Sequence, residues 1–251
     1  MTVPKDHPRY RSLVTRERLA DMVARGIVNP TGLISHGRGE AFDYLMGEKS
    51  IVPALKAEKA AAAFLLSASN PVVCVNGNAA ALGAKELIAL AEEVDAKIEV
   101  NIFHRTEDRM ELIIGYMESE GAEGVLGRRP DARIPGLTSD RALCTKEGIF
   151  DCDVILVPIE DGDRAEALAA MGKTVISIDL NPLSRTSKKA TVSISDEMNR
   201  ALENIKGFAK ELKGKKSQTA EIIRDYDNGA VRRETVLSIC GALMEEFKEG
   251  E

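Results

Sequence analysis

Residues 34–40 (ISHGRGE) have the composition of an anion-binding segment. They set His36 and Arg38 around two glycines, directly before a predicted helix over 40–46. Glycine lets the main chain approach a ligand closely, and a helix N-terminus favours negative charge. We therefore expect a phosphate or carboxylate to bind here, with a capped surface loop as the alternative.

Residues 179–189 (DLNPLSRTSKK) follow a predicted buried strand over 173–179. The segment gathers one acid, one amide, three bases and three hydroxyls. A carboxylate at a strand end, such as Asp179, can accept hydrogen bonds from ribose hydroxyls, whereas Arg185 and Thr186 can donate to phosphate oxygens. A solvated polar loop is the alternative.

Basic side chains also follow a predicted strand over 97–103, where His104, Arg105 and Arg109 span the start of the next helix. Cations oppose the dipole at this helix end, so an anionic ligand would relieve the conflict. Exposed pairing with the acids at 107 and 108 is the alternative.

Further candidates lie outside these three segments. Asn76 follows a strand predicted over 72–75 and is either a turn former or an amide turned toward a ligand. Arg16 stands in the first turn of a helix predicted to begin at Thr15. A long segment, 121–148, has little periodicity and is either a loop that closes over an anion or a solvated face. Its arginines are Arg128, Arg129 and Arg133.

The pattern of elements predicts an α/β fold. Helices expected over 15–25, 40–46 and 53–66 make a helical N-terminal region, residues 1–66. Residues 67–251 then alternate strands and helices, which favours a Rossmann-like parallel sheet flanked by helices, forming one compact unit with the first region. The remaining predicted strands and helices cover 72–75, 79–94, 97–103, 107–118, 153–158, 164–171, 173–179, 196–212 and 219–247.

Composition excludes several classes of protein. The chain has 251 residues, 34 of them basic and 40 acidic, with a net charge of -6, so it lacks the overall positive charge of proteins that bind nucleic acid or anionic membranes. The longest mainly apolar stretch, 60–66, is too short to span a bilayer, and we expect a cytoplasmic protein. Four separated cysteines without a C-x-x-C pair argue against a zinc knuckle and suggest buried thiols.

Several common catalytic motifs are missing from the sequence. The glycine spacing fits neither a P-loop nor a dinucleotide fingerprint. Neither a Ser-His-Asp order nor H-E-x-x-H occurs, so covalent hydrolysis and zinc chemistry lack support. Separate cationic segments on an acidic chain suggest instead one or two ligands that carry many negative charges.

Six strings in order over about residues 5–205 carry a family resemblance: DHPRYRSLVTRERL, GLISHGRGEAFDYLMGE, VNGNAAAL, EVNIFHRTEDR, PDARIPGL and VISIDLNPLSRT. They resemble the archaeal phosphopantothenate synthetase family (4-phosphopantoate–β-alanine ligase). The resemblance implies a homodimeric ligase of coenzyme A biosynthesis that joins 4-phosphopantoate to β-alanine while ATP becomes AMP and pyrophosphate. A nucleotide-binding module without chemistry and a small-molecule kinase that forms ADP are the alternatives.

The resemblance also implies site residues. The ATP contacts would be Arg16, Arg38, Asp179, Leu180, Asn181, Arg185, Thr186, Glu197 and Met198. Relatives are expected to have Asn and an apolar residue at the last two positions, so only main-chain contacts are expected there. Arg38, Arg185 and His36 are the expected catalytic residues; the two arginines would stabilise the charge that develops on the phosphates. Mg²⁺ would bridge these phosphates, and no protein metal ligand is assigned. The expected substrate contacts are His104, Arg105, Asn76 and Arg133.

Overall fold

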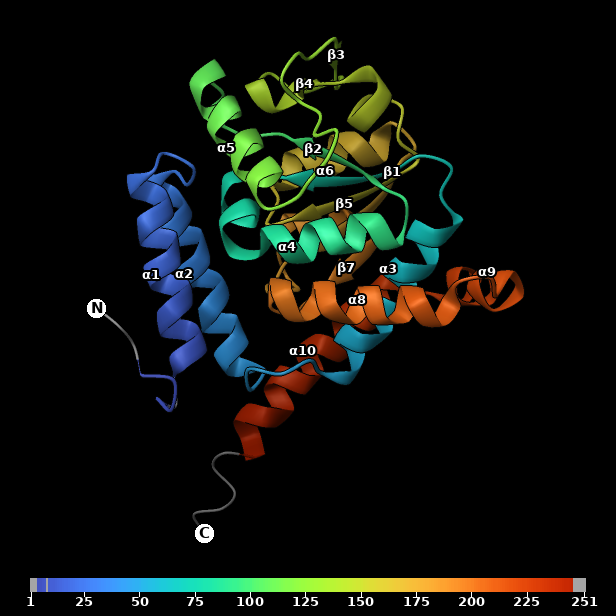
Figure 1. Cartoon of the computed structure of the whole chain (residues 1–251). Helices are drawn as coiled ribbons and strands as arrows, with labels where there is room; N and C mark the ends of the chain where they lie inside the picture. The colour runs from blue at the N-terminus through green and yellow to red at the C-terminus, as the bar shows by residue number, and fades with distance from the viewer. Residues whose placement is uncertain (1–3, 8, 246–251) are drawn as a thin grey trace.

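The computed structural model describes residues 4–7 and 9–245, and its centre is a parallel sheet in the order β2-β1-β5-β6-β7 (Figure 1). Its strands are β1 (Pro71–Val75), β2 (Lys97–Val100), β5 (Val154–Pro158), β6 (Thr174–Ile178) and β7 (Val192–Ile194). The winding reverses between β1 and β5, and ligands of such sheets bind outside the carboxyl ends of the strands at this switch point. The predicted α/β class is confirmed.

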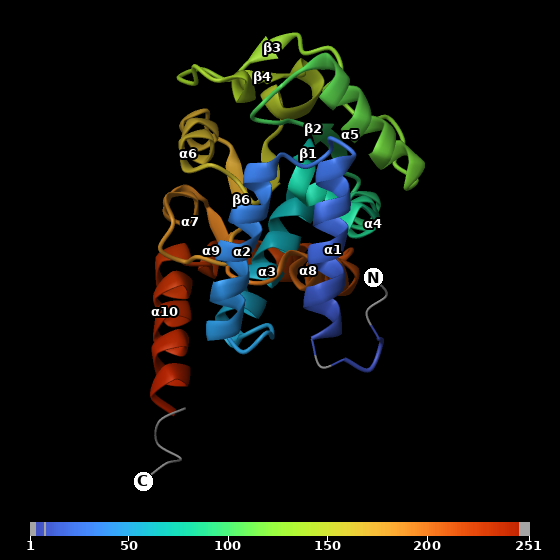
Figure 2. The ribbon, with the colours of Figure 1, turned by 90° about the vertical axis from the view of Figure 1, so that its left-hand side faces the viewer.

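Helices precede, flank and follow the sheet. They are α1 (Tyr10–Ala24), α2 (Pro30–Leu45), α3 (Val52–Ser67), α4 (Gly77–Glu93), α5 (Glu107–Ser119), α6 (Gly162–Ala170), α7 (Arg185–Lys189), α8 (Met198–Leu212), α9 (Lys216–Asp225) and α10 (Asn228–Glu245). Figure 2 looks toward the side where α1 and α2 stand in front of the sheet. Within the described residues, none of these helices has the length and apolar character needed to cross a membrane.

Both faces of the sheet are covered, which explains why the strands are apolar throughout. All five residues of β1 are buried. Val73 and Val75 pack in a core cluster with α3, α4 and α8, whereas Val72 and Cys74 pack on the opposite face with α6 and the π-helical turn η2 (Lys146–Phe150). Alternate residues of one strand therefore serve two cores.

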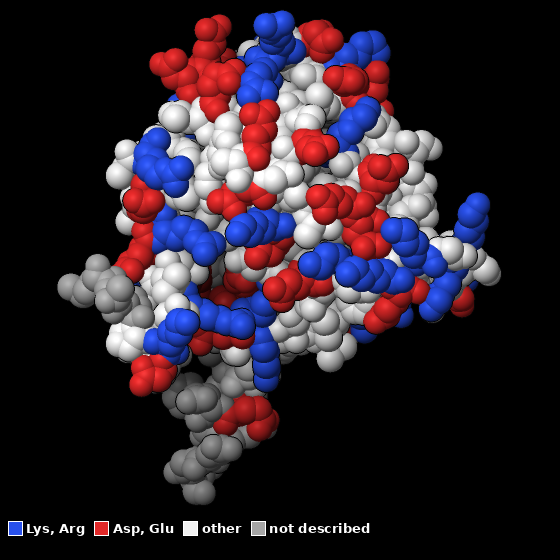
Figure 3. Space-filling model, viewed as in Figure 1, with Lys and Arg blue, Asp and Glu red and all other residues white. Residues whose placement is uncertain are grey.

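Charged side chains are interspersed on the face shown in Figure 3, where basic and acidic groups lie over α4 and α8. One ion pair joins the ends of these helices, with Lys213 Nζ 3.0 Å from Glu93 Oε1. Three cysteines are buried as expected, but Cys240 on α10 is exposed, so the prediction of four buried thiols is wrong for this residue.

The segment expected as a long loop is ordered by short elements: β3 (Ala132–Arg133), a 3-10 turn η1 (Asp140–Ala142), β4 (Leu143–Cys144) and η2. Buried Glu99 on β2 accepts hydrogen bonds from the main-chain N–H groups of Thr145 and Ile149, both at 2.7 Å. These bonds tie the segment to the sheet, which argues against a free lid.

The structure corrects the N-terminal helix boundaries. Helix α1 begins at Tyr10, so Thr15 lies inside it and is not its cap. Helix α2 begins at Pro30, and the side chain of Asn29 caps it by accepting from Thr31 N at 3.0 Å. Asn before Pro is a strong start signal. Residues 34–40 are therefore helical, and the predicted glycine-rich loop at a helix N-terminus is wrong.

Smaller corrections concern the other elements. Strand β2 ends at Val100, three residues earlier than expected. Strand β7 and helix α7 were missed, because each is short. The predicted helix over 219–247 is two helices separated at 226–227, and its expected end at Phe247 lies outside the described residues.

Candidate active site

Two cavities open along the carboxyl edge of the sheet. The larger cavity, of about 570 Å³, lies between α2, the ends of β5 and β6, and the start of α8. The smaller cavity, of about 230 Å³, lies between the starts of α2 and α4 and the segment after β2. Ser35, Ile159 and Asp161 line both cavities, so the two meet at one junction.

The larger cavity gathers most of the predicted nucleotide and catalytic residues. They come from α2, from the segment after β6 and from the start of α8, which are far apart in the sequence. Those that line it are His36, Arg38, Asp179, Leu180, Asn181, Arg185, Thr186, Glu197 and Met198.

Asp179 organises the segment after β6. Its carboxylate accepts from Asn181 N at 3.0 Å and from the hydroxyl of Ser184, the residue that caps α7. Burial raises the pKa of Asp179, whereas the positive charge of Arg38 on α2 acts to lower it. An acid and a base from two elements thus face the same cavity.

Helix α2 forms one wall of the larger cavity. Burial lowers the pKa of His36, so its imidazole is neutral near pH 7. Its Nε2 atom is buried and has no hydrogen-bond partner among the described residues. Arg38 is exposed and donates a 3.4 Å hydrogen bond to Ser35 Oγ, which leaves most of its N–H groups available to a ligand.

The start of α8 forms the opposite wall. Glu197 caps the helix, with its carboxylate accepting from the main-chain N–H groups of Asn199 and Arg200, each at 3.1 Å. Arg200 in turn pairs with Asp43 of α2 at 2.5 Å and with Asp196 at 2.6 Å. This ion-pair network holds α2 against α8 and so fixes the width of the cavity.

Arg16 does not line either cavity. Its guanidinium donates to Glu40 of α2, with Nη2 2.8 Å from Oε2, and Glu40 lines the larger cavity. The hydrogen bond with Glu40 is the main cause that raises the pKa of Arg16. Contact between Arg16 and a ligand would therefore require the Arg16–Glu40 pair to open.

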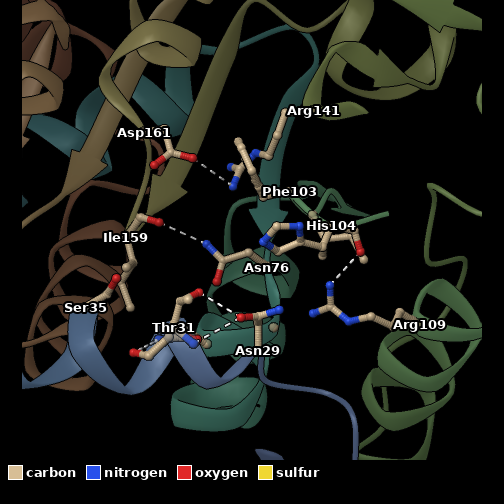
Figure 4. A pocket seen from close by; sticks show the side chains of 14 residues that line it. Asn29, Thr31, Ser35, Asn76, Phe103, His104, Arg109, Arg141, Ile159 and Asp161 are labelled. Carbon is tan, nitrogen blue, oxygen red and sulfur yellow. Dashed lines mark hydrogen bonds and ion pairs between the residues drawn. The ribbon is translucent and has the colours of Figure 1, made fainter. Parts of the chain in front are cut away.

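The smaller cavity lies at the starts of two helices (Figure 4). Asn76 caps α4, because its Oδ1 accepts from Ala79 N at 3.0 Å, and its amide donates to the carbonyl oxygens of Pro158 and Ile159. Asn76 and His104, two of the predicted substrate residues, line this cavity. The other two do not: Arg105 donates to Gly127 O and Arg133 to Leu137 O, away from both cavities.

Two arginines complete the smaller cavity. Arg109 donates to three carbonyl oxygens, including His104 O at 2.6 Å and Ile27 O at 3.3 Å. Burial lowers its pKa, and no acidic side chain in the described part of the chain pairs with it. Arg141 from η1 is only 5% exposed and pairs with buried Glu160. Arg109 could be suspected from its position after a strand, whereas Arg141 stands in no recognisable motif.

The turn after β5 was missed altogether by the sequence analysis. Ile159 has φ 53, a left-handed conformation that is unusual for a β-branched residue. Burial alone would raise the pKa of the next residue, Glu160, but Arg141 and Arg164 lower it. The signal available in the sequence was a pair of acids, Glu160 and Asp161, directly after a buried strand.

The fold and the joined cavities define a doubly wound α/β protein with a two-part ligand site at the carboxyl edge of its sheet. A profile of the family described as phosphopantothenate/pantothenate synthetase matches residues 53–242. A relative from Methanosarcina mazei, named 4-phosphopantoate–β-alanine ligase, is 53% identical over 238 residues, 94% of each chain. A relative of the same name from Thermococcus onnurineus is 48% identical over 250 residues, 99% of this chain and 96% of its own. The chain therefore belongs to the phosphopantothenate/pantothenate synthetase family and is an enzyme.

Proposed function

We propose that the protein is an ATP-dependent ligase that joins 4-phosphopantoate to β-alanine, through an acyl-adenylate, and releases AMP and pyrophosphate in coenzyme A biosynthesis. The names of the relatives support the two substrates. The observation that carries the proposal is the junction of the two cavities at Ser35, Ile159 and Asp161. A reaction between a nucleotide and a second anion needs two neighbouring sites that meet at the reacting atoms.

We assign the nucleotide to the larger cavity. Asp179 and Asn181 at the end of β6 are placed to hold the ribose, as acids at this position do in related sheets. Arg38 and Arg185 would bind the phosphates and stabilise the charge that develops when the bond to pyrophosphate breaks. Arg185 is 62% exposed and now pairs with Glu166 at 2.5 Å, so it would exchange this partner for the nucleotide.

We assign 4-phosphopantoate to the smaller cavity, with its phosphate toward Arg109. Three of the five N–H groups of this guanidinium donate to carbonyl oxygens, which leaves two for a ligand. The starts of α2 and α4 add the positive ends of two helix dipoles. The carboxylate of the substrate would then lie toward the junction, where its oxygen meets the α-phosphate of the nucleotide.

The donor chemistry fits Mg²⁺ bound chiefly through the nucleotide. In the described part of the chain, no group of three or more metal-ligating side chains is gathered. Mg²⁺ keeps most of its own water and needs only one or two carboxylates. We assign no protein side chain to the metal, because Asp179 holds the ribose in this proposal. When bound, Mg²⁺ would neutralise part of the negative charge of the phosphates.

The proposal also includes a homodimer, as the resemblance implies, and a cytoplasmic location, as expected from the sequence. Light scattering of the purified protein would measure the mass of the assembly. A mass of one 27.2 kDa chain would contradict the dimer.

Product analysis tests the reaction. The purified protein is incubated with ATP, Mg²⁺, 4-phosphopantoate and β-alanine, and the nucleotide product is identified by chromatography. AMP and pyrophosphate, formed only when both substrates are present, are expected. ADP would contradict the adenylate route, and no turnover would contradict the proposed function.

A further inference from the structure

The turn after β5 carries a carboxylate that accepts no hydrogen bond from the described residues. Asp161 is the N-cap residue of α6, yet its side chain accepts no hydrogen bond from the first turn of that helix. Aspartate is among the best capping residues, so a helix start with this bond unmade is unusual. Its carboxylate lies instead toward Arg141, whose Nη1 is 3.6 Å away, at the junction of the two cavities (Figure 4).

Asp161 differs from the other acids around the cavities. Each of these others accepts at least one hydrogen bond: Glu40, Asp43, Glu160, Asp179, Asp196 and Glu197. Among the described residues none donates a hydrogen bond to the side-chain carboxylate of Asp161, and its 3.6 Å contact with Arg141 is too long for one. Asp161 is therefore the carboxylate at the junction that is available to a ligand.

The main chain holds Asp161 there at a conformational cost. Ile159 has φ 53, and such strained conformations persist only when their surroundings fix them. Asn76 Nδ2 donates to Ile159 O at 3.1 Å, and Ile159 N donates to Ile178 O at 3.1 Å. Such strain is concentrated at functional sites.

We propose that Asp161 binds the ammonium group of the amine substrate and accepts a proton from it. The inference rests on the proposed ligase function. An alkyl ammonium group is protonated near neutral pH and has no lone pair for attack. One proton moves from this nitrogen to the Asp161 carboxylate. The nitrogen then forms the C–N bond with the acyl carbon, the bond from that carbon to the phosphate oxygen breaks with its electron pair leaving on AMP, and the second nitrogen proton passes to water.

The charges around Asp161 suit this role. Burial raises its pKa; Arg141 and Arg164 act to lower the pKa, whereas Glu160 and Asp163 act to raise it, and the net direction is upward. A carboxylate with a raised pKa is a better proton acceptor. Its side chain is 56% exposed, so a substrate can reach it.

Asp161→Asn separates a role in the attack of the amine from a role in forming the acyl-adenylate. We expect the variant to retain pyrophosphate exchange into ATP in the presence of 4-phosphopantoate alone. Its kcat/KM for β-alanine should fall by about 100-fold to 10,000-fold, the usual contribution of a general base. Hydroxylamine, which is largely unprotonated at neutral pH, should still give the hydroxamate at nearly the wild-type rate. Asp161→Glu should recover part of the activity with β-alanine.

Asp95→Asn is the matched control, because this exposed residue after α4 lines neither cavity and is not among the charges that act on Asp161. It should behave as the wild type. Loss of exchange in Asp161→Asn, a shifted Mg²⁺ requirement, or equal losses with both nucleophiles would overturn the inference. If the wild-type protein itself shows no exchange, the proposed function fails and the inference fails with it.

Discussion

The side-chain amide of Asn76 donates to the carbonyl oxygen of Ile159 at 3.1 Å and so joins the ends of β1 and β5 at the switch point of the sheet. The same side chain caps α4 through Oδ1. One residue therefore sets both the strained turn that carries Asp161 and the helix start beside it.

Asn76→Asp should separate these two tasks. Aspartate keeps the cap on α4 but loses the amide donor and brings its charge against two carbonyl oxygens. We expect a loss of about 1–3 kcal/mol in the free energy of unfolding, the cost of unsatisfied buried polar groups. Urea denaturation measures this loss. Equal stability of the variant and the wild type would show that the amide does not hold the turn.

Glycines of α2 offer a second test within one helix. A Cβ atom on Gly32 would lie 2.1 Å from Asn78 Oδ1, whereas a Cβ atom on Gly37 would meet no described residue within 4 Å. Gly32→Ala should therefore destabilise the protein by about 1–3 kcal/mol. Gly37→Ala should stabilise it by about 0.5–1 kcal/mol, because alanine favours the helix. Thermal denaturation of both variants measures these changes in stability. A lower stability of Gly37→Ala than of the wild type would argue for the loop that the sequence suggested.

These glycines explain why the sequence misled us in this region. Glycine-rich segments are usually turns, but here Gly32 and Gly39 allow close packing inside a helix. A Cβ atom on Gly39 would lie 3.2 Å from Leu180, so α2 approaches the segment after β6 closely. Such contacts between distant segments leave no periodic trace in the sequence.

The strands and the polar residues at their ends could be predicted from the sequence, whereas some residues that line the cavities could not. The strand β1 was predictable because burial on both faces demands an unbroken apolar run. Polar residues at strand ends, such as Asn76 and Asp179, were found by the same logic. Arg141 was not, because its burial depends on Glu160 and Arg164, which only the tertiary fold brings to it.

Arg38→Ala tests the nucleotide assignment. Because this exposed side chain lines the larger cavity and forms no ion pair with the described residues, its loss should lower kcat/KM for ATP by about 100-fold or more. The free energy of unfolding should change by less than about 0.5 kcal/mol. Arg11→Ala, an exposed residue of α1 outside both cavities, is the control. Unchanged kinetics would remove Arg38 from the site.

Arg109→Gln tests the phosphate assignment. We expect kcat/KM for 4-phosphopantoate to fall by about 100-fold, as for other buried charge contacts, and kcat/KM for pantoate to change little. Because both substrates are measured on the same variant, a loss that is specific to 4-phosphopantoate reflects recognition of its phosphate and not a folding defect. Arg128→Ala is the control, because Arg128 pairs with Glu111 and Glu118 outside both cavities. A uniform loss with both substrates would mean that Arg109 acts only through structure.

Glu58→Gln tests a buried carboxyl group that interacts with Asp196, a residue that lines the larger cavity. Burial raises the pKa of Glu58 to about 9, with Asp196 adding to the shift and Asn204 and Arg200 opposing it. In the unfolded chain this group has its ordinary pKa of 4.5. Between these values the folded protein keeps a proton that the unfolded chain has lost, so the contribution of Glu58 to stability is full below pH 4.5 and is lost as the pH rises toward 9.

Glutamine cannot ionise and can still accept the 2.9 Å hydrogen bond from Asn204 Nδ2. The variant should therefore match the wild type at low pH and exceed its free energy of unfolding by about 1–3 kcal/mol in mildly alkaline buffer. Urea denaturation at both pH values measures the difference, with Glu203→Gln, an exposed change on α8, as the control. A gain of the same size at both pH values would place the effect in packing, and no gain at either would mean that Glu58 keeps an ordinary pKa in the fold.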